Sequence, residues 1–170
     1  MERQFSKYYS VPSYSVEQIS PHQLSVVARI HAQCFSDCWD ELTLKKILQM
    51  PGSFGFVARS PRFDSVIGFA LCRVSADQCE LLSLGVARDY RKQGIATTLM
   101  RSAMDMAFSE KVRWFFLEVA IDNDAAARLY EAHGLKKVGV RPNYYENKDG
   151  TRTDANTMRA DLAKYMLSDI

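Results

Sequence analysis

The sequence has no apolar run long enough to cross a membrane, and none follows the first residues, Met1 to Phe5. A transmembrane helix needs roughly 18 consecutive apolar residues, and a secretory leader needs a shorter apolar stretch close to the start. These absences predict no membrane partner and a cytoplasmic location.

An excess of one charge is also missing. The chain has 22 Lys and Arg residues against 20 Asp and Glu residues, for a formal net charge of +2, and its basic residues are scattered. Binding to a nucleic-acid duplex relies on clustered Lys and Arg side chains that displace counterions. We therefore expect no direct contact with nucleic acid.

Metal and nucleotide motifs are absent as well. Neither G-x-G-x-x-G nor G-x-x-x-x-G-K-[ST] occurs, which argues against a dinucleotide or a nucleoside triphosphate. The cysteines form one C-x-x-x-C and two isolated thiols, unlike the paired C-x-x-C spacing of zinc sites. We expect no metal and small, partly buried thiols at Cys34, Cys38, Cys72 and Cys79.

The composition is that of one globular domain, predicted to span residues 1–170. Hydrophobic residues make up 47% of the chain and charged residues 25%, and this length can bury a core without a disulfide. Hydrophobic periodicity predicts a compact α+β unit. The expected strands are 14–19, 54–59, 66–74, 80–86, 112–119, 137–140 and 153–161, with a hairpin turn at 147–150; the expected helices are 20–35, 40–50, one beginning at 93–94, and 123–133.

Three details of this pattern can be compared with a structure. Strand 112–119 contains a continuous apolar run between two helical segments, so we expect it to be buried on both faces at the centre of the sheet. His31 recurs at helical spacing with Val27 and Ile30, which predicts a core residue rather than a ligand. Trp39 is the one large aromatic residue in a polar loop, where exposure of its ring would need an explanation.

The segment Arg91-Lys92-Gln93-Gly94-Ile95-Ala96 joins a predicted strand to a predicted helix. Free N–H groups of such a turn and the helix dipole converge on one point, which favours an anion such as pyrophosphate. Gly94 lets the backbone approach phosphate, Ala96 keeps the first turn narrow, and Arg91 and Lys92 add positive charge. A basic helix cap is the plainer interpretation of so short a pattern.

With Leu84-Gly85-Val86 before it, this loop resembles the acetyl-CoA signature of the GNAT acetyltransferases. Further segments resemble one branch of that family, the ribosomal-protein-alanine acetyltransferases. The resemblance is continuous from Gly68 to Leu162 and weaker earlier, where Phe35, Trp39 and the following helix are similar to the substrate side. The downstream segments are Leu117-Glu118-Val119, Asn123, Ala125-Ala126-Ala127 with Leu129-Tyr130-Glu131, His133-Gly134-Leu135, and Asn143-Tyr144-Tyr145 before Asp149-Gly150.

The resemblance implies a GNAT fold, with a mostly antiparallel central sheet that splays between the strands of Val86 and Glu118 and about four flanking helices. It implies that the Val86 N–H binds the thioester carbonyl of acetyl-CoA, that Glu118 is a general base acting through water, and that Tyr130 is the general acid for the CoA thiolate. It assigns to the cofactor Leu84, Gly85, Val86, Arg91, Lys92, Gln93, Gly94, Ile95, Ala96, Thr97 and Asn123, and to the acceptor peptide Trp39, Tyr144 and Tyr145.

Plainer alternatives exist for several of these residues. Glu118 also fits a strand-end carboxylate paired with an arginine, and Tyr130 fits a packing tyrosine with a satisfied hydroxyl. Tyr144 and Tyr145 are neighbours in a strand and are expected to point to opposite faces, so that one of them lines the peptide groove.

The chemistry of the amine favours one acceptor class. An α-amine with a pKa near 8 is about one-tenth neutral at pH 7, whereas a lysine near 10.4 is neutral about four times in ten thousand. That gap is roughly 3.4 kcal/mol, more than a general base contributes at the low end of its range. The resemblance adds the N-terminal alanine of ribosomal protein bS18 as the expected acceptor.

Two departures from the branch concern the acceptor rather than acetyl-CoA: Ala120 stands where Arg is usual, and Pro142 stands where a basic residue is common. The alternatives that stay open are a GNAT enzyme that acetylates a lysine or a small amine, and a non-catalytic acyl-CoA-binding module.

Overall fold

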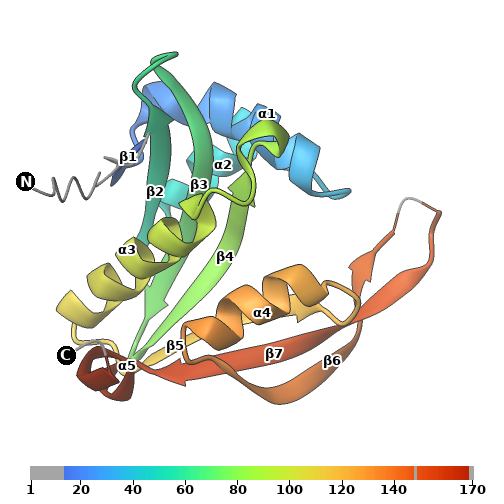
Figure 1. Ribbon diagram of the computed structural model, residues 1–170. Coiled ribbons are helices and arrows are strands. Elements are labelled where there is room, and N and C mark those ends of the chain that lie inside the picture. The colour runs from blue at the N-terminus through green and yellow to red at the C-terminus, as the bar shows by residue number, and fades with distance from the viewer. Residues whose placement is uncertain (1–13, 148, 169–170) are drawn as a thin grey trace, which may run out of the picture.

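The computed structural model describes residues 14–147 and 149–168 (Figure 1). Within these residues, one seven-stranded sheet has the order β1-β2-β3-β4-β5-β7-β6. Neighbouring strands are antiparallel except β4 and β5, which are parallel. The strands are β1 (Ser15–Gln18), β2 (Ser53–Ser60), β3 (Ser65–Ser75), β4 (Gln78–Val86), β5 (Trp114–Ala120), β6 (Lys136–Glu146) and β7 (Arg152–Asp161).

The helices follow the predicted order. They are α1 (Leu24–Cys34), α2 (Glu41–Gln49), α3 (Ile95–Ser109), α4 (Asp124–Ala132) and α5 (Leu162–Ser168), with 3-10 turns at Pro21–Gln23 and Arg88–Tyr90. Only α5 lacks a counterpart in the sequence analysis. Residues 1–5 and Lys148, on which two expectations partly rest, lie outside the described residues. No helix in the described ranges is long and apolar enough to span a membrane.

Side chains at the helix ends explain where the helices begin. Asp40 precedes α2 and accepts a hydrogen bond from the Thr43 N–H at 2.7 Å, and Asn123 precedes α4 and accepts from the Ala126 N–H at 3.2 Å. These short polar side chains satisfy N–H groups that have no partner inside the helix. Gly134, at φ +79°, follows α4 in the left-handed conformation that commonly ends a helix.

Helices cover both faces of the sheet. Figure 1 shows α3 and α4 on one face and α1 and α2 on the other. Helix α3 buries Ile95, Leu99, Ala103 and Ala107 at one residue per turn, as predicted, with Met100 and Met104 beside them. This stripe packs in a core cluster with residues of β2 to β5, while α1 and α2 pack in a second cluster against the opposite face.

The expectation for the strand at 112–119 was wrong in two respects. Strand β5 lies between β4 and β7, and the middle strand of the seven is β4. Burial along β5 alternates, with Phe115, Leu117 and Val119 buried and Trp114 and Phe116 half-buried. On the half-buried face, Trp114 packs under the guanidinium groups of Arg113 and Arg159. These cation–π contacts stabilise a large aromatic side chain there without full burial.

The splay expected between the strands of Val86 and Glu118 is present. Strands β4 and β5 pair only between residues 78–80 and residues 114–116, and beyond this point they diverge (Figure 1). On the other side of β4, the Ala87 N–H donates to the Ile67 carbonyl, and Val86 pairs with Gly68. Because partners alternate along an antiparallel ladder, the N–H groups of Leu84 and Val86 point away from β3 and into the splay.

Candidate active site

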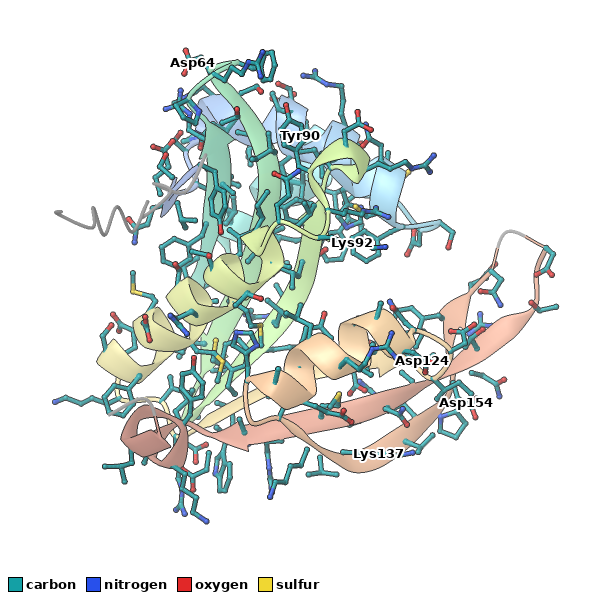
Figure 2. All side chains as sticks on the ribbon, viewed as in Figure 1. Asp64, Tyr90, Lys92, Asp124, Lys137 and Asp154 are labelled. Atoms are coloured by element: carbon teal, nitrogen blue, oxygen red, sulfur yellow. The ribbon has the colours of Figure 1, made fainter. Side chains whose placement is uncertain are left out.

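The loop between β4 and α3 presents a series of free N–H groups. Lys92 and Gly94 adopt left-handed backbone conformations, with φ of 62° and 79°. The N–H groups of residues 92–97 donate no hydrogen bond to any described residue. Figure 2 shows Lys92 on this loop and Asp124 at the beginning of α4, on opposite sides of the splay. Clustered free N–H groups at a helix N-terminus are suited to an anion.

Side chains fix this loop in place from two directions. The Nε of Arg91 donates to the Val86 carbonyl at 3.1 Å, which ties the loop to the end of β4. On the other side, the Tyr14 hydroxyl lies 2.8 Å from Thr98 Oγ1, and a Cβ added to Gly94 would lie 3.7 Å from the same hydroxyl. Sequence reasoning missed Tyr14, because the contact joins residues 84 positions apart.

Glu118 lies on β5 beyond the last position paired with β4. Its side chain is only 6% exposed. The Thr157 hydroxyl, opposite it on β7, lies 3.0 and 2.8 Å from the two carboxylate oxygens, and Arg141 Nη1 lies 3.5 Å from Oε1. The Tyr145 hydroxyl donates to the Glu118 carbonyl at 2.9 Å. The arginine pairing considered above is therefore present, and Thr157 is a partner that the sequence did not reveal.

Glu80 is a second carboxylate that sequence reasoning missed. It is opposite Phe116 at the last paired position, so Glu80, Phe116 and Glu118 share one face of the sheet. Burial first, and then the charge of Glu118, raise the pKa of Glu80, while Arg141 and Arg73 lower it. A pocket of about 410 Å³ adjoins Glu80; its lining residues are Arg73, Ser75, Ala76, Gln78, Glu80 and Phe116.

Tyr130 lies on α4, on the side of the splay that faces the core. It is 8% exposed, and its hydroxyl makes no hydrogen bond with the described residues. Burial raises its pKa to about 12. Tyr130 thus packs in the core, and its phenol stays protonated at neutral pH. Asn123, assigned to the pantetheine arm, uses its side-chain oxygen to cap α4.

The two adjacent tyrosines do not point to opposite faces, contrary to expectation. Their rings lie 4.9 Å apart, edge to face. Asn143 has φ of 53°, and the β6–β7 register shifts between Arg141 and Tyr145, so the alternation of a regular strand is broken here. Tyr145 is held by its bond to Glu118, while Tyr144 is 40% exposed beneath the Arg141 guanidinium.

Trp39 is half-buried rather than fully exposed. Its ring stacks on His31 with centroids 4.8 Å apart, and its backbone N–H donates to His31 Nδ1 at 3.1 Å. His31 is 2% exposed, which confirms it as a core residue. Trp39 is not among the groups that contact Glu118, so its assignment to the acceptor peptide stays a prediction.

Acidic, cysteine and histidine side chains do not gather into a metal-binding group anywhere in the described ranges. The four cysteines are free thiols: Cys72 and Cys79 are buried, Cys34 is half-buried and Cys38 is exposed.

Fold, splay and loop together define a class of protein. Residues 24–135 match the model of the acetyltransferase (GNAT) family. The chain belongs to this family.

Comparison with individual proteins identifies similar members within this family. The N-alpha-acetyltransferase RimI of Mycobacterium tuberculosis is 34% identical over 79% of this chain and 84% of its own length. A bS18-alanine N-acetyltransferase of Haemophilus ducreyi is 32% identical over 56% of this chain, and the match spans 66% of that relative. The crystal structure of the Escherichia coli enzyme for the same ribosomal protein superposes with a TM-score of 0.79 at 27% identity, covering 88% of this chain and 94% of that one.

The environment of His31 predicts a loss of stability in mild acid. Burial lowers its pKa from 6.5 to about 4, while Asp37 raises it slightly. The unfolded chain therefore takes up a proton at His31 more readily than the folded one. The contribution of neutral His31 to the free energy of unfolding should be complete above pH 6.5 and be lost as the pH falls toward 4. His31→Gln, which retains an acceptor for Trp39, should flatten this dependence in urea titrations from pH 7 to 5. The exposed His22→Gln is the control, and parallel curves for H31Q and the wild type would contradict the assignment.

Proposed function

We propose that this protein transfers an acetyl group from acetyl-CoA to the N-terminal α-amine of a protein, with the N-terminal alanine of ribosomal protein bS18 as acceptor. The observation that carries the proposal is the gap between β4 and β5, which stop pairing after Glu80 and Phe116. There the N–H groups of Leu84 and Val86 are free on one side of β4, and Glu118 lies on β5 two residues beyond the last pair. An extended thioester arm can take the place of the missing strand pairing.

The cofactor assignment follows from the loop. The pyrophosphate of acetyl-CoA is bound by the free N–H groups of residues 92–97, with Lys92 adding charge, and the arm runs along Leu84-Gly85-Val86 toward Asn123. An N–H from Val86 at the thioester carbonyl would stabilise the tetrahedral oxyanion by about 3 kcal/mol, as other oxyanion donors do. Arg91 acts mainly through its bond to the Val86 carbonyl.

The reaction then needs one proton removed and one supplied. The neutral amine attacks the thioester carbon, the C–S bond breaks, and the amide forms. Glu118 accepts the proton that the amine loses, through a water molecule, while the Tyr130 hydroxyl donates to the departing sulfur. With a pKa of about 12, the phenol is present as a donor at every physiological pH. No covalent intermediate with the protein is required.

The acceptor assignment rests on two supports. The relatives named above are a bS18-alanine N-acetyltransferase and an N-alpha-acetyltransferase. The alignment with the second covers most of this chain. The α-amine is also the easier nucleophile, since its neutral fraction at pH 7 exceeds that of lysine by more than two orders of magnitude. Ala120 and Pro142 mark where recognition can differ from the ribosomal enzymes.

Binding of acetyl-CoA should depend on the backbone at Gly94. Gly94→Ala places a side chain at φ +79° in the loop and should weaken binding of acetyl-CoA about tenfold by calorimetry. Gly150→Ala is a matched control, because Gly150 has φ +81° with no atom within 4 Å of its added Cβ. Equal dissociation constants for the two variants would contradict the loop assignment.

A panel of acceptors tests the function itself. We expect CoA release with a peptide that begins with the alanine of bS18, little release with its acetyl-blocked form, and little with a peptide whose only amine is a lysine. Acetylation of the lysine peptide alone would overturn the choice of acceptor, and faster reaction of polyamines would assign the enzyme to small amines. Acetyl-CoA binding without release on any amine would mark a binding module.

The role of Tyr130 can be separated from cofactor binding. Tyr130→Phe should lower kcat about 100-fold, the low end for a proton donor, while the dissociation constant of acetyl-CoA changes less than threefold. Tyr14→Phe, which removes the hydroxyl beside Thr98, should show the reverse pattern. Stopped-time thiol assays and calorimetry measure the two quantities; similar losses of both in Tyr130→Phe would exclude the proton-donor role.

A further inference from the structure

Arg141 lies between the two groups that form the acceptor side of the site. Its Nη1 is 3.5 Å from Glu118 Oε1, and its guanidinium carbon lies over the Tyr144 ring, 4.9 Å from the ring centre. The Arg141 side chain is 57% exposed, whereas that of Glu118 is 6% exposed. The guanidinium is therefore the boundary between the carboxylate and solvent.

The charges around this position come from several elements. Glu118 on β5 makes its single ion pair within the described residues with Arg141. Glu80 on β4 is influenced by Glu118, by Arg141 and by Arg73 on β3. The remaining charged or titratable groups are Arg159 on β7, which lies opposite Phe116 on the same face of the sheet, and the phenols of Tyr144 and Tyr145 on β6 and of Tyr130 on α4. Two carboxylates thus share one close cation on the side from which an acceptor must approach.

An acceptor α-amine is itself a cation when it arrives, because about nine-tenths of it is protonated at pH 7. Its ammonium and the Arg141 guanidinium would compete for the same carboxylate. A half-exposed ion pair is weak enough to exchange, whereas a nearly buried carboxylate without any cation is costly. The Tyr144 ring offers the displaced guanidinium a second favourable contact.

We propose that Arg141 is a positioning residue for the acceptor: its guanidinium holds the place of the acceptor ammonium on Glu118 and, when an acceptor binds, gives up Glu118 while it keeps its contact with Tyr144. This inference rests on the proposed function, since it takes an amine as the acceptor. It adds that Arg141 neutralises Glu118 when no acceptor is bound, and that the acceptor ammonium then takes the place of the guanidinium.

Two variants of Arg141 and one matched control test this. Arg141→Met retains the length of the side chain without the charge, and Arg141→Lys retains the charge without the planar group. Arg152→Met is the control, because Arg152 is 54% exposed and pairs with Glu146 at 3.2 Å on the same hairpin. As both side chains are more than half exposed, the three variants should fold.

At pH 8, Arg141→Met should lower KM for the alanine peptide about threefold or more, with KM for acetyl-CoA unchanged, because the competing cation is gone. Arg141→Lys should restore the wild-type KM, and Arg152→Met should match the wild type.

A measurement without turnover separates this inference from the proposed function. Carbon-13 NMR of the unliganded protein, with the Glu80 signal assigned through Glu80→Gln, should show the titration of Glu80 at higher pH in Arg141→Met than in Arg152→Met. Equal Glu80 titrations, or an acceptor KM in Arg141→Met equal to that of Arg152→Met, would overturn the role of Arg141. Failure of the wild type to acetylate any α-amine would instead overturn the proposed function. The NMR comparison would still decide whether Arg141 lies close enough to these carboxylates to lower the pKa of Glu80.

Discussion

Three paired positions join the two halves of the sheet, and the chemistry of the molecule depends on where that pairing stops. Gln78, Cys79 and Glu80 pair with Trp114, Phe115 and Phe116, and past this point β4 and β5 separate. Had the pairing continued, the N–H groups of Leu84 and Val86 would be used by β5. Because it ends, these donors stay free, and Glu118, two residues past the last pair, has no partner on β4. The proposed function places the thioester in this gap.

The second constraint is the near-complete burial of Glu118. A buried carboxylate needs partners, and this one has a hydroxyl from Thr157, a guanidinium from Arg141 and a backbone tie through Tyr145. The Thr157 hydroxyl and the tie through Tyr145 hold the residue in place, whereas the exposed guanidinium of Arg141 is the partner that can exchange. A structural pairing and the proposed chemical role are therefore compatible in the same residue.

Much of the fold was accessible from the sequence because it is local. Helix caps at Asp40 and Asn123 and the stripe of α3 are periodic or short-range features, and the six residues Arg91 to Ala96 were enough to predict a turn with free N–H groups before α3. The position of β5 in the sheet was not accessible, since an apolar run shows burial but not which strands lie beside it. The face shared by Tyr144 and Tyr145 depends on a backbone irregularity at Asn143, which no alternating pattern signals.

The candidate site was predictable in part, for the same reason. Glu118 and Tyr130 were found through resemblance, and their roles stay predictions. Thr157, Arg141, Glu80 and Tyr14 were missed because each enters through strand register or through a contact between distant segments. Register of this kind is settled only when the whole sheet assembles.

The short pairing between β4 and β5 also separates most of the proposed cofactor-binding groups from the proposed acceptor groups. The loop, its helix and the free donors belong to the half built from β1 to β4, whereas Glu118, Tyr130, Arg141 and the two tyrosines belong to the half built from β5 to β7. Because only three positions pair across the division, substitutions in one half disturb few contacts of the other. Under the proposed function, acceptor recognition can therefore change along the β6–β7 hairpin with little effect on the loop between β4 and α3.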